Sequence, residues 1–368
     1  MSRRAVALLV AVLIGGILGS RALSPLGSDS ETTGPPAPNA ESPSAPRPKA
    51  APTSRTPRGA PTPVPNSGVR PRRRILASLV RRTAREAKGR VQVAILPEGR
   101  EVPIAVASSG SARGRFRMWS VSKVVTAIAL LEAHGWRERS GEPLTADTRR
   151  AMSSGLIGSS DCAQRQMVVE LQELLGGPLE ARAAYQDVLA RAGTRAATVT
   201  GRIAPAGSGC RSYLRRSQLA DPFRPALQLG TAEWSVSDGA RFALALGDGT
   251  YARAVTRQVL RLLRRPKTRS DDPFAQGRDV TTNPAWGAGL VLRDLQPAYK
   301  SGWGGASGET PTFVNEQVIH LATPDRGSYG IAITFEPPNR PARDDPGLTQ
   351  APRAFDQLLR GVRRELRL

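Results

Sequence analysis

The sequence is poor in the side chains that usually hold metals. It contains two cysteines, Cys162 and Cys210, and two histidines, His134 and His320, and these four residues do not have the spacing of a zinc site. Two histidines also argue against a Ser-His-Asp triad. His134 closes an apolar run and His320 stands in a strand-like run, so we interpret both as structural. We therefore expect neither a metal nor a cofactor.

Negative charge is also scarce. The chain has 31 Asp and Glu against 53 Lys and Arg, a net charge of +22. Such an excess favours an anionic partner, which nucleic acid, an anionic membrane surface or an anionic cell-wall polymer would satisfy, although arginines without any function at exposed positions give the same total. The basic residues are scattered and form no recognisable nucleic-acid module, so we expect no nucleic-acid partner.

The first 74 residues are predicted to lie outside the folded domain. Arg3 and Arg4 precede an apolar run, so residues 1–24 are predicted to be a cleaved signal peptide or an uncleaved N-terminal membrane anchor. Residues 25–74 are predicted to be a disordered linker, because 12 of the 31 prolines fall between Pro35 and Pro71. We expect a secreted or cell-wall protein that touches the membrane only through its N-terminal segment.

Residues 75–368 are predicted to form one α+β domain. Strand-like segments stand near both ends of this region, VQVAILPEG and EVPIAVASS first and AYKSGW, EQVIHLATP and YGIAITFE last, with helical patterns between and outside them. The simplest arrangement is one antiparallel sheet with flanking helices and an inserted all-helical lobe. We place the sheet lobe at about 75–119 and 235–368 and the helical lobe at about 120–234, and we expect a monomer with a cleft between the lobes.

The segment MWSVSKVVTAIALLE places Ser120 and Lys123 at the start of an apolar helix. Residues three apart lie on one helix face, so these two side chains project together. An apolar setting lowers the pKa of a lysine, and a neutral lysine can take the proton of a neighbouring serine. Ser120 is thus a candidate nucleophile and Lys123 its base. The alternative is a helix-capping serine and a solvated lysine.

Two later segments extend this pattern. In GSSDCAQRQM, Ser160 and Asp161 precede a predicted helix, and in AYKSGWGG, Lys300, Ser301 and Gly302 lie on a predicted strand. With SVSK, the set resembles the penicillin-recognising serine enzymes, whose motifs are S-x-x-K, S-D-N and K-[ST]-G. Over residues 75–368 the chain is similar to class A β-lactamases in motif order and in the strands that follow the third motif.

The resemblance implies an acyl-serine mechanism on a β-lactam or a D-Ala-D-Ala-like peptidoglycan peptide. Ser120 would attack the carbonyl, and the backbone N–H groups of Ser120 and Trp303 would form the oxyanion hole. Ser160 would pass a proton to the leaving nitrogen. Lys300 would lower the pKa of that serine and, with Ser301, hold the substrate carboxylate. Gly302 completes the third motif.

One departure from the family concerns hydrolysis of the acyl-enzyme. Class A enzymes carry a deacylating glutamate after the second motif, but no Asp or Glu occurs from Val188 to Ala220. Asp221 and Glu233 are the nearest candidates, and neither has the E-x-x-L-N context. We therefore expect the acyl-enzyme to persist. The alternative is a catalytically degenerate, cell-wall-associated binding protein that keeps the fold without turnover.

A second departure is Cys162, which stands where the aligned S-D-N motif has asparagine, beside Asp161. In an oxidising compartment the only two cysteines should pair, so we put forward a Cys162–Cys210 disulfide. In the chain-entropy model a loop of this length stabilises the fold by about 4 kcal/mol. The alternative is two unrelated cysteines.

Overall fold

The structure is a computed structural model of the whole chain. It describes residues 73–100, 105–109, 114–136, 143–198, 232–265, 287–305, 313–337 and 350–368. The chain divides into two units, 1–62 and 63–368, and every described residue belongs to the second. The predicted leader at 1–24 and the linker as far as residue 72 lie outside the described residues. In the described part, the helices are too short or too polar to cross a bilayer.

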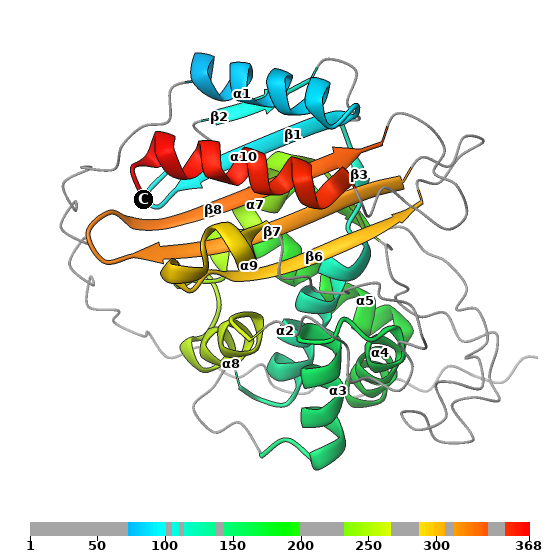
Figure 1. Cartoon of the computed structure of the whole chain (residues 1–368). Coiled ribbons are helices and arrows are strands. Elements are labelled where there is room, and N and C mark those ends of the chain that lie inside the picture. Colours follow the sequence, from blue (N-terminus) through cyan, green and yellow to red (C-terminus); the bar gives the residue numbers. More distant parts are fainter. Residues whose placement is uncertain are drawn as a thin grey trace, which may run out of the picture. The chain divides into compact units, whose positions relative to one another are not determined.

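The described residues contain a five-stranded antiparallel sheet of strand order β2-β1-β8-β7-β6, which is drawn in Figure 1. Strands from the two ends of the domain lie side by side, because β1 pairs along its whole length with β8. This confirms the predicted α+β class and the antiparallel sheet built from both ends. The strands are β1 (Arg90–Pro97), β2 (Ala105–Ser108), β6 (Ala298–Gly305), β7 (Phe313–Thr323) and β8 (Gly327–Glu336).

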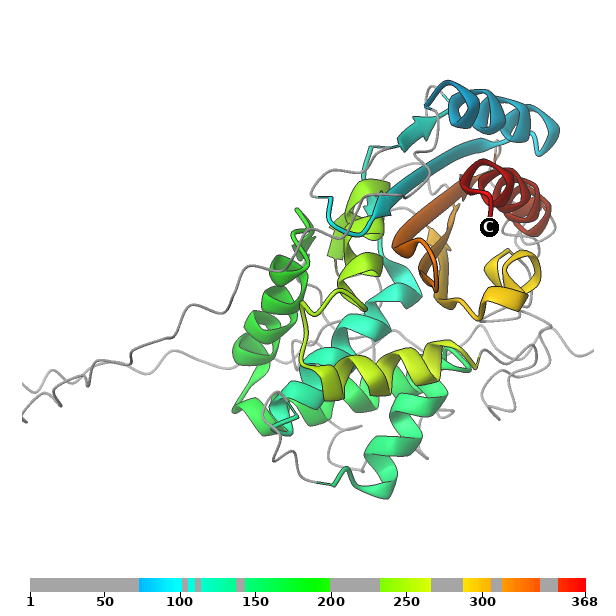
Figure 2. The same cartoon turned by 90° about the vertical axis from the view of Figure 1, so that its left-hand side faces the viewer.

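The two faces of the sheet belong to different cores, as the alternation of side chains along a strand requires. On β1, Val93 and Ile95 pack in one apolar cluster, whereas Ala94 and Leu96 pack in the other. Three helices cover the first face, and Figure 2 shows them together on one side of the strands, at the right of the view. They are α1 (Arg73–Glu86), α9 (Ala288–Val291) and α10 (Gln350–Leu366).

The second face of the sheet is covered by α7 (Val236–Ala245), which lies against β8, β1 and β7. Further from the sheet lies the helical lobe, in which α2 is central and contacts its neighbours on several sides. The helices of this lobe are α2 (Ser122–Ala133), α3 (Ala146–Leu156), α4 (Asp161–Leu175), α5 (Pro178–Arg191) and α8 (Arg253–Leu263).

The position of α8 differs from the expected lobe boundary. We expect the helical lobe to end at about residue 234, but α8 follows that bound and packs on α2 and α3. Its apolar side, which includes Val255, Val259 and Leu263, is buried in the same cluster as α2. The chain therefore goes to the sheet with α7 and returns to the helical lobe with α8.

A second, smaller sheet has the order β3-β5-β4 in the described part. Its strands are β3 (Phe116–Arg117), β4 (Ala197–Thr198) and β5 (Ala232–Trp234). Strand β3 leads directly into a short 3-10 helix, η1 (Trp119–Val121), which precedes α2. Strand β6, at the edge of the large sheet, contacts η1. This contact brings the start of α2 close to the strand that carries Lys300, Ser301 and Gly302.

Gly330 shows how closely α7 lies against the sheet. A Cβ added at Gly330 would meet the carbonyl oxygen of Ala240 and, at 2.7 Å, the backbone nitrogen of Leu244. Both are backbone atoms and cannot move aside as a flexible side chain can. Gly330→Ala should therefore lower the free energy of unfolding by about 3 kcal/mol or more, by the mechanism of overpacking. Denaturant unfolding followed by circular dichroism measures this change.

Gly114→Ala is the matched control, because a Cβ added at Gly114 has nothing within 4 Å. Its effect on unfolding should stay within about 0.5 kcal/mol. Equal stability of the two variants would contradict the close packing of α7 on β8.

Candidate active site

Ser120 and Lys123 lie together at the entrance of the helical lobe. Ser120 is in η1 and Lys123 in the first turn of α2, so the serine precedes the α-helix that we expect it to open. Lys123 Nζ lies 2.8 Å from Ser120 Oγ. Lys123 is fully buried, whereas Ser120 is partly exposed. An accessible hydroxyl thus has a desolvated amine as its neighbour.

The backbone turns sharply just before this serine. Trp119 has a φ of 40°, in the left-handed region that residues with a Cβ rarely adopt. Ser122 Oγ donates a hydrogen bond to the carbonyl oxygen of Trp119 at 2.5 Å, which holds this turn and directs the Ser122 hydroxyl away from Ser120. Strained backbone of this kind is common at functional sites.

Ser159, rather than Ser160, lies between the two lysines. Lys300 Nζ donates to Ser159 Oγ at 2.7 Å, and Lys123 Nζ lies 3.4 Å from the same oxygen. Ser159 is buried and has a φ of 57°. This hydroxyl therefore connects the first and third motifs, which are far apart in the sequence.

The structure corrects the predicted position of the relay serine. Ser160 is the N-cap of α4, and its hydroxyl accepts a hydrogen bond from the backbone N–H of Ala163 at 3.2 Å. Capping engages the Ser160 hydroxyl at the helix end. The left-handed backbone of Ser159, by contrast, turns the side chain of Ser159 toward the lysines. The structure thus places the Ser159 hydroxyl, and not that of Ser160, beside the two lysines.

Asp161 takes the place that we expect Cys162 to take. Asp161 Oδ1 accepts a hydrogen bond from Lys123 Nζ at 2.9 Å, although the carboxylate side chain remains 68% exposed. One turn further along both helices, Gln164 Nε2 donates to Thr126 Oγ1 at 2.9 Å and holds α4 to α2. The site therefore has a carboxylate in contact with the lysine of the first motif.

Burial lowers the pKa of both lysines. For Lys123, loss of hydration lowers the pKa, and the Asp161 carboxylate partly opposes this effect. For Lys300, loss of hydration and then the nearby Lys123 hold the pKa well below its ordinary value. Two buried amines around one hydroxyl, with one carboxylate in contact, favour a state in which one amine is neutral and able to accept a proton.

Ser301 lies on a different side of β6 from the Lys300 amine. Its Oγ accepts a hydrogen bond from Gln317 Nε2 at 3.1 Å, and Gln317 Oε1 accepts one from the backbone N–H of Ala288 in α9. Consecutive strand residues point to opposite faces, and these partners lie on the α9 face. Within the described residues the Ser301 hydroxyl is not brought to the group around Ser159, so its expected contact with a substrate carboxylate stays a prediction.

Gly302 allows β6 to approach the start of the helical lobe. A Cβ added at Gly302 would lie 3.2 Å from the carbonyl oxygen of Met118, two residues before Ser120, and 2.7 Å from Glu316 Oε1. The next residue, Trp303, pairs with Asn315 on β7. The backbone of β6 thus passes close to η1, as the predicted oxyanion hole of Ser120 and Trp303 requires, although that hole remains a prediction.

Glu316 is a buried carboxyl group that the sequence reasoning missed. It accepts a hydrogen bond from Trp234 Nε1 at 3.2 Å and lies behind Gly302. Burial holds its pKa well above the ordinary value for glutamate, against the weaker effects of Trp234 and Lys300. The sequence gives no sign of this burial, because a glutamate in a strand is ordinarily expected on the exposed face.

The remaining predicted residues have simpler surroundings. Cys162 is buried in the first turn of α4 and is disulfide-bonded, and Cys210, the only other cysteine of the sequence, lies outside the described residues, as does Asp221. Glu233 lies 3.8 Å from Arg117 in the small sheet. His134 is 2.9 Å from Glu170, and the described residues contain no cluster of metal-binding side chains.

Comparison with known proteins adds a likeness in fold. The chain resembles class A β-lactamases. A double mutant of the class A β-lactamase of the last common ancestor of Gram-negative bacteria has 17% identity and a TM-score of 0.48, over 80% of this chain and 99% of that one. The chromosome-encoded β-lactamase of Vibrio parahaemolyticus has 13% identity and a TM-score of 0.48, over 78% and 98%.

Two other comparisons gave no match, since no family model and no curated protein matches the chain. At the identities found for these β-lactamases the likeness concerns the fold alone. The chemical function of the site therefore depends on the contacts among the residues of this chain.

The raised pKa of Glu316 predicts a change of stability with pH. A carboxyl group whose pKa is higher in the folded state stabilises the fold below its unfolded pKa, and this contribution is lost as the pH rises above about 4.3. Glu316→Gln keeps an oxygen for Trp234 and cannot ionise. The stability of this variant relative to wild type should therefore be greater at pH 8 than at pH 5. Urea unfolding at both pH values tests this, and an equal difference at both would contradict the buried, protonated carboxyl group.

Proposed function

We propose that this protein is a serine acyl-transfer enzyme of the β-lactamase and penicillin-binding type. Its substrate would be a β-lactam or the D-Ala-D-Ala-like end of a peptidoglycan peptide, and the reaction would pass through an ester of Ser120. The observation that carries the proposal is the group formed by Ser120, Lys123, Ser159 and Lys300, in which successive N–O distances are 2.8, 3.4 and 2.7 Å. Export of the protein, predicted from residues 1–24, is part of the proposal.

The group is suited to acylation by three linked proton transfers. Neutral Lys123 would take the proton of the Ser120 hydroxyl while its oxygen attacks the substrate carbonyl carbon. The carbon–nitrogen bond then breaks, and the leaving nitrogen takes a proton from the Ser159 hydroxyl. Lys123, which now carries the proton of Ser120, would return a proton to Ser159, whose oxygen lies 3.4 Å from its Nζ, while Lys300 holds the same oxygen at 2.7 Å. The proton taken from Ser120 would thus reach the leaving group.

The fate of the acyl-enzyme depends on what activates water or another acceptor. Glu316 lies buried behind Gly302 with a raised pKa, so we assign it no role as a base. Asp161 is exposed and contacts Lys123, so among the described residues it is the carboxylate best placed to accept a proton from water. An exposed carboxylate is a weak base, which favours slow hydrolysis or transfer to an amine acceptor.

Covalent labelling tests the proposal. Incubation with a penicillin should add the mass of one penicillin to the protein, and peptide mapping should place the adduct on Ser120. Ser120→Ala should form no adduct, because the nucleophile is removed. A folded wild-type protein that never forms an adduct, even at high penicillin concentration, would favour the alternative of a binding protein without turnover.

The neighbouring serines provide a matched pair for the same assay. Ser159→Ala should slow adduct formation by about 100-fold or more, the usual value of a general acid–base group. Ser160→Ala should lower stability by about 1 kcal/mol through loss of the helix cap and leave the acylation rate within a few fold. A slow Ser160→Ala with a fast Ser159→Ala would restore the register that the sequence predicts.

Asp161→Asn should change the pH dependence of acylation. The carboxylate raises the pKa of Lys123, so its removal lowers that pKa further, and neutral lysine is then available at lower pH. The acid limb of the rate of adduct formation should therefore move to lower pH. Asp147→Asn is the charge-matched control, because Asp147 is exposed and pairs with Arg150 in α3. A limb that moves to higher pH, or moves equally in both variants, would contradict the role of Lys123 as base.

A further inference from the structure

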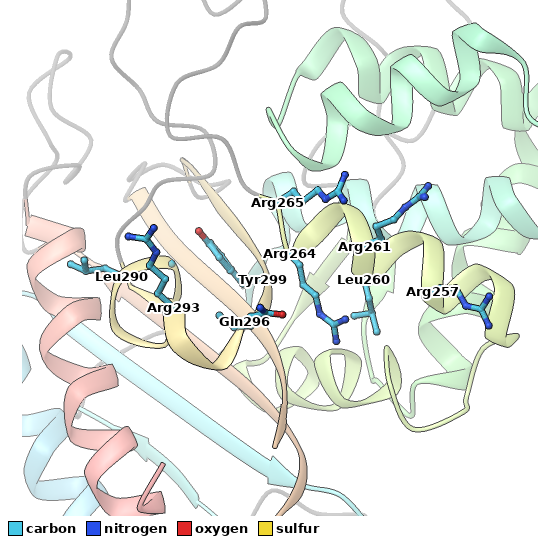
Figure 3. Close-up of a pocket in the computed structure, with 11 residues that line it drawn as sticks. Arg257, Leu260, Arg261, Arg264, Arg265, Leu290, Arg293, Gln296 and Tyr299 are labelled. Carbon is cyan, nitrogen blue, oxygen red and sulfur yellow. The ribbon is translucent and has the colours of Figure 1, made fainter. Parts of the chain in front are cut away.

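A pocket apart from the candidate active site lies between α8 and the segment that leads into β6. It has a volume of about 950 Å³, at the upper end of the roughly 300–1,000 Å³ typical of small-molecule sites. Figure 3 shows helix α8 on one side and α9 with the following 3-10 helix η3 (Arg293–Leu295) on the other. The apolar part of the wall includes Leu260, Pro297 and Tyr299.

Arginine dominates the lining of this pocket. Two of the lining arginines belong to α8, two follow its last residue directly and one belongs to η3, and the lining residues include neither Asp nor Glu: Arg257, Arg261, Arg264, Arg265 and Arg293. The spacing of three and four residues places the α8 arginines along one side of that helix, opposite the buried Val255, Val259 and Leu263. In Figure 3, Arg264 and Gln296 extend toward each other from the two walls.

These five guanidinium groups lack a carboxylate partner within the part of the chain that the structure describes. The nearest acidic residue in the wall segment, Asp294, is held by Arg363 of α10 through contacts of 2.8 and 2.6 Å. Like charges gathered without counter-charge repel one another, which costs stability unless an anion is present. The described lining of the pocket is therefore positively charged and suited to bind an anion.

We propose that this pocket binds a multiply charged phosphate anion. Guanidinium groups match phosphate oxygens with two parallel hydrogen bonds, and several guanidiniums around a concave space suit several phosphates close together. The concave shape fits a compact or threaded chain of phosphates better than a duplex or a flat membrane. Condensed phosphate and a phosphodiester polymer share this chemistry and are the two sources to distinguish.

Calorimetric titration of the full chain with inorganic tripolyphosphate tests the proposal, without substrate and therefore independently of the proposed function. Arg261→Gln/Arg264→Gln should weaken binding at least tenfold. The matched control is Arg353→Gln/Arg360→Gln, in a second basic hollow that also contains Glu86 and Asp356 and so has its own counter-charge. This control should retain wild-type affinity.

Three outcomes would overturn the proposal. Equal weakening in the two double variants would mean general attraction to a basic protein, and equally tight binding of citrate would remove the preference for phosphate. In the sequence, the segment that links residue 265 to residue 287 carries Asp271, Asp272 and Asp279, which lie outside the described residues. If Asp271→Asn/Asp272→Asn/Asp279→Asn binds tripolyphosphate at least tenfold more tightly than wild type, the arginines serve the chain's own carboxylates instead.

The source of the phosphate follows from a competition between two probes. A short poly(glycerol phosphate) that displaces tripolyphosphate and binds more tightly would identify a phosphodiester polymer as the ligand. Tighter binding of tripolyphosphate would identify condensed phosphate. Either result supports the proposal, provided that both probes lose affinity in Arg261→Gln/Arg264→Gln.

Discussion

Two amines that share one hydroxyl inside the protein are the constraint on which the site depends. Lys123 and Lys300 both reach Ser159, and both are buried. Their mutual repulsion and the loss of hydration make two full charges unfavourable there, and Asp161 supplies the contacting carboxylate. The arrangement is costly for stability, and such costs are characteristic of places where proton transfer is carried out.

The fold holds these groups by bringing together three distant segments. The turn at Trp119 directs the start of α2, the left-handed Ser159 directs the start of α4, and the absence of a side chain at Gly302 lets β6 come close. Each is a local backbone feature that costs stability or leaves little room for a side chain. The large apolar clusters on the two faces of the sheet supply the stability that offsets them.

The sequence predicts the Ser120–Lys123 contact, because residues three apart lie on one helix face. It also predicts the antiparallel sheet, because the strand patterns stand at both ends of the domain. The position of the relay serine was not predictable, since Ser159 and Ser160 are chemically identical and only the backbone φ decides which hydroxyl faces the lysines. The face of Ser301 could have been inferred from strand alternation. The spacing of the arginines from 257 to 265 shows in the sequence that they share one side of a helix. The opposite wall of the pocket comes from residues 289–299, and only the tertiary structure shows that these residues lie nearby.

Strand β6 separates the arginine pocket from the candidate active site, and adjacent residues of the strand face the two. Tyr299 belongs to the lining of the arginine pocket, while its neighbour Lys300 holds Ser159 from the other surface of the same strand. Because adjacent residues of a strand share one backbone, a displacement of Tyr299 in the pocket wall would also displace Lys300 at the candidate active site.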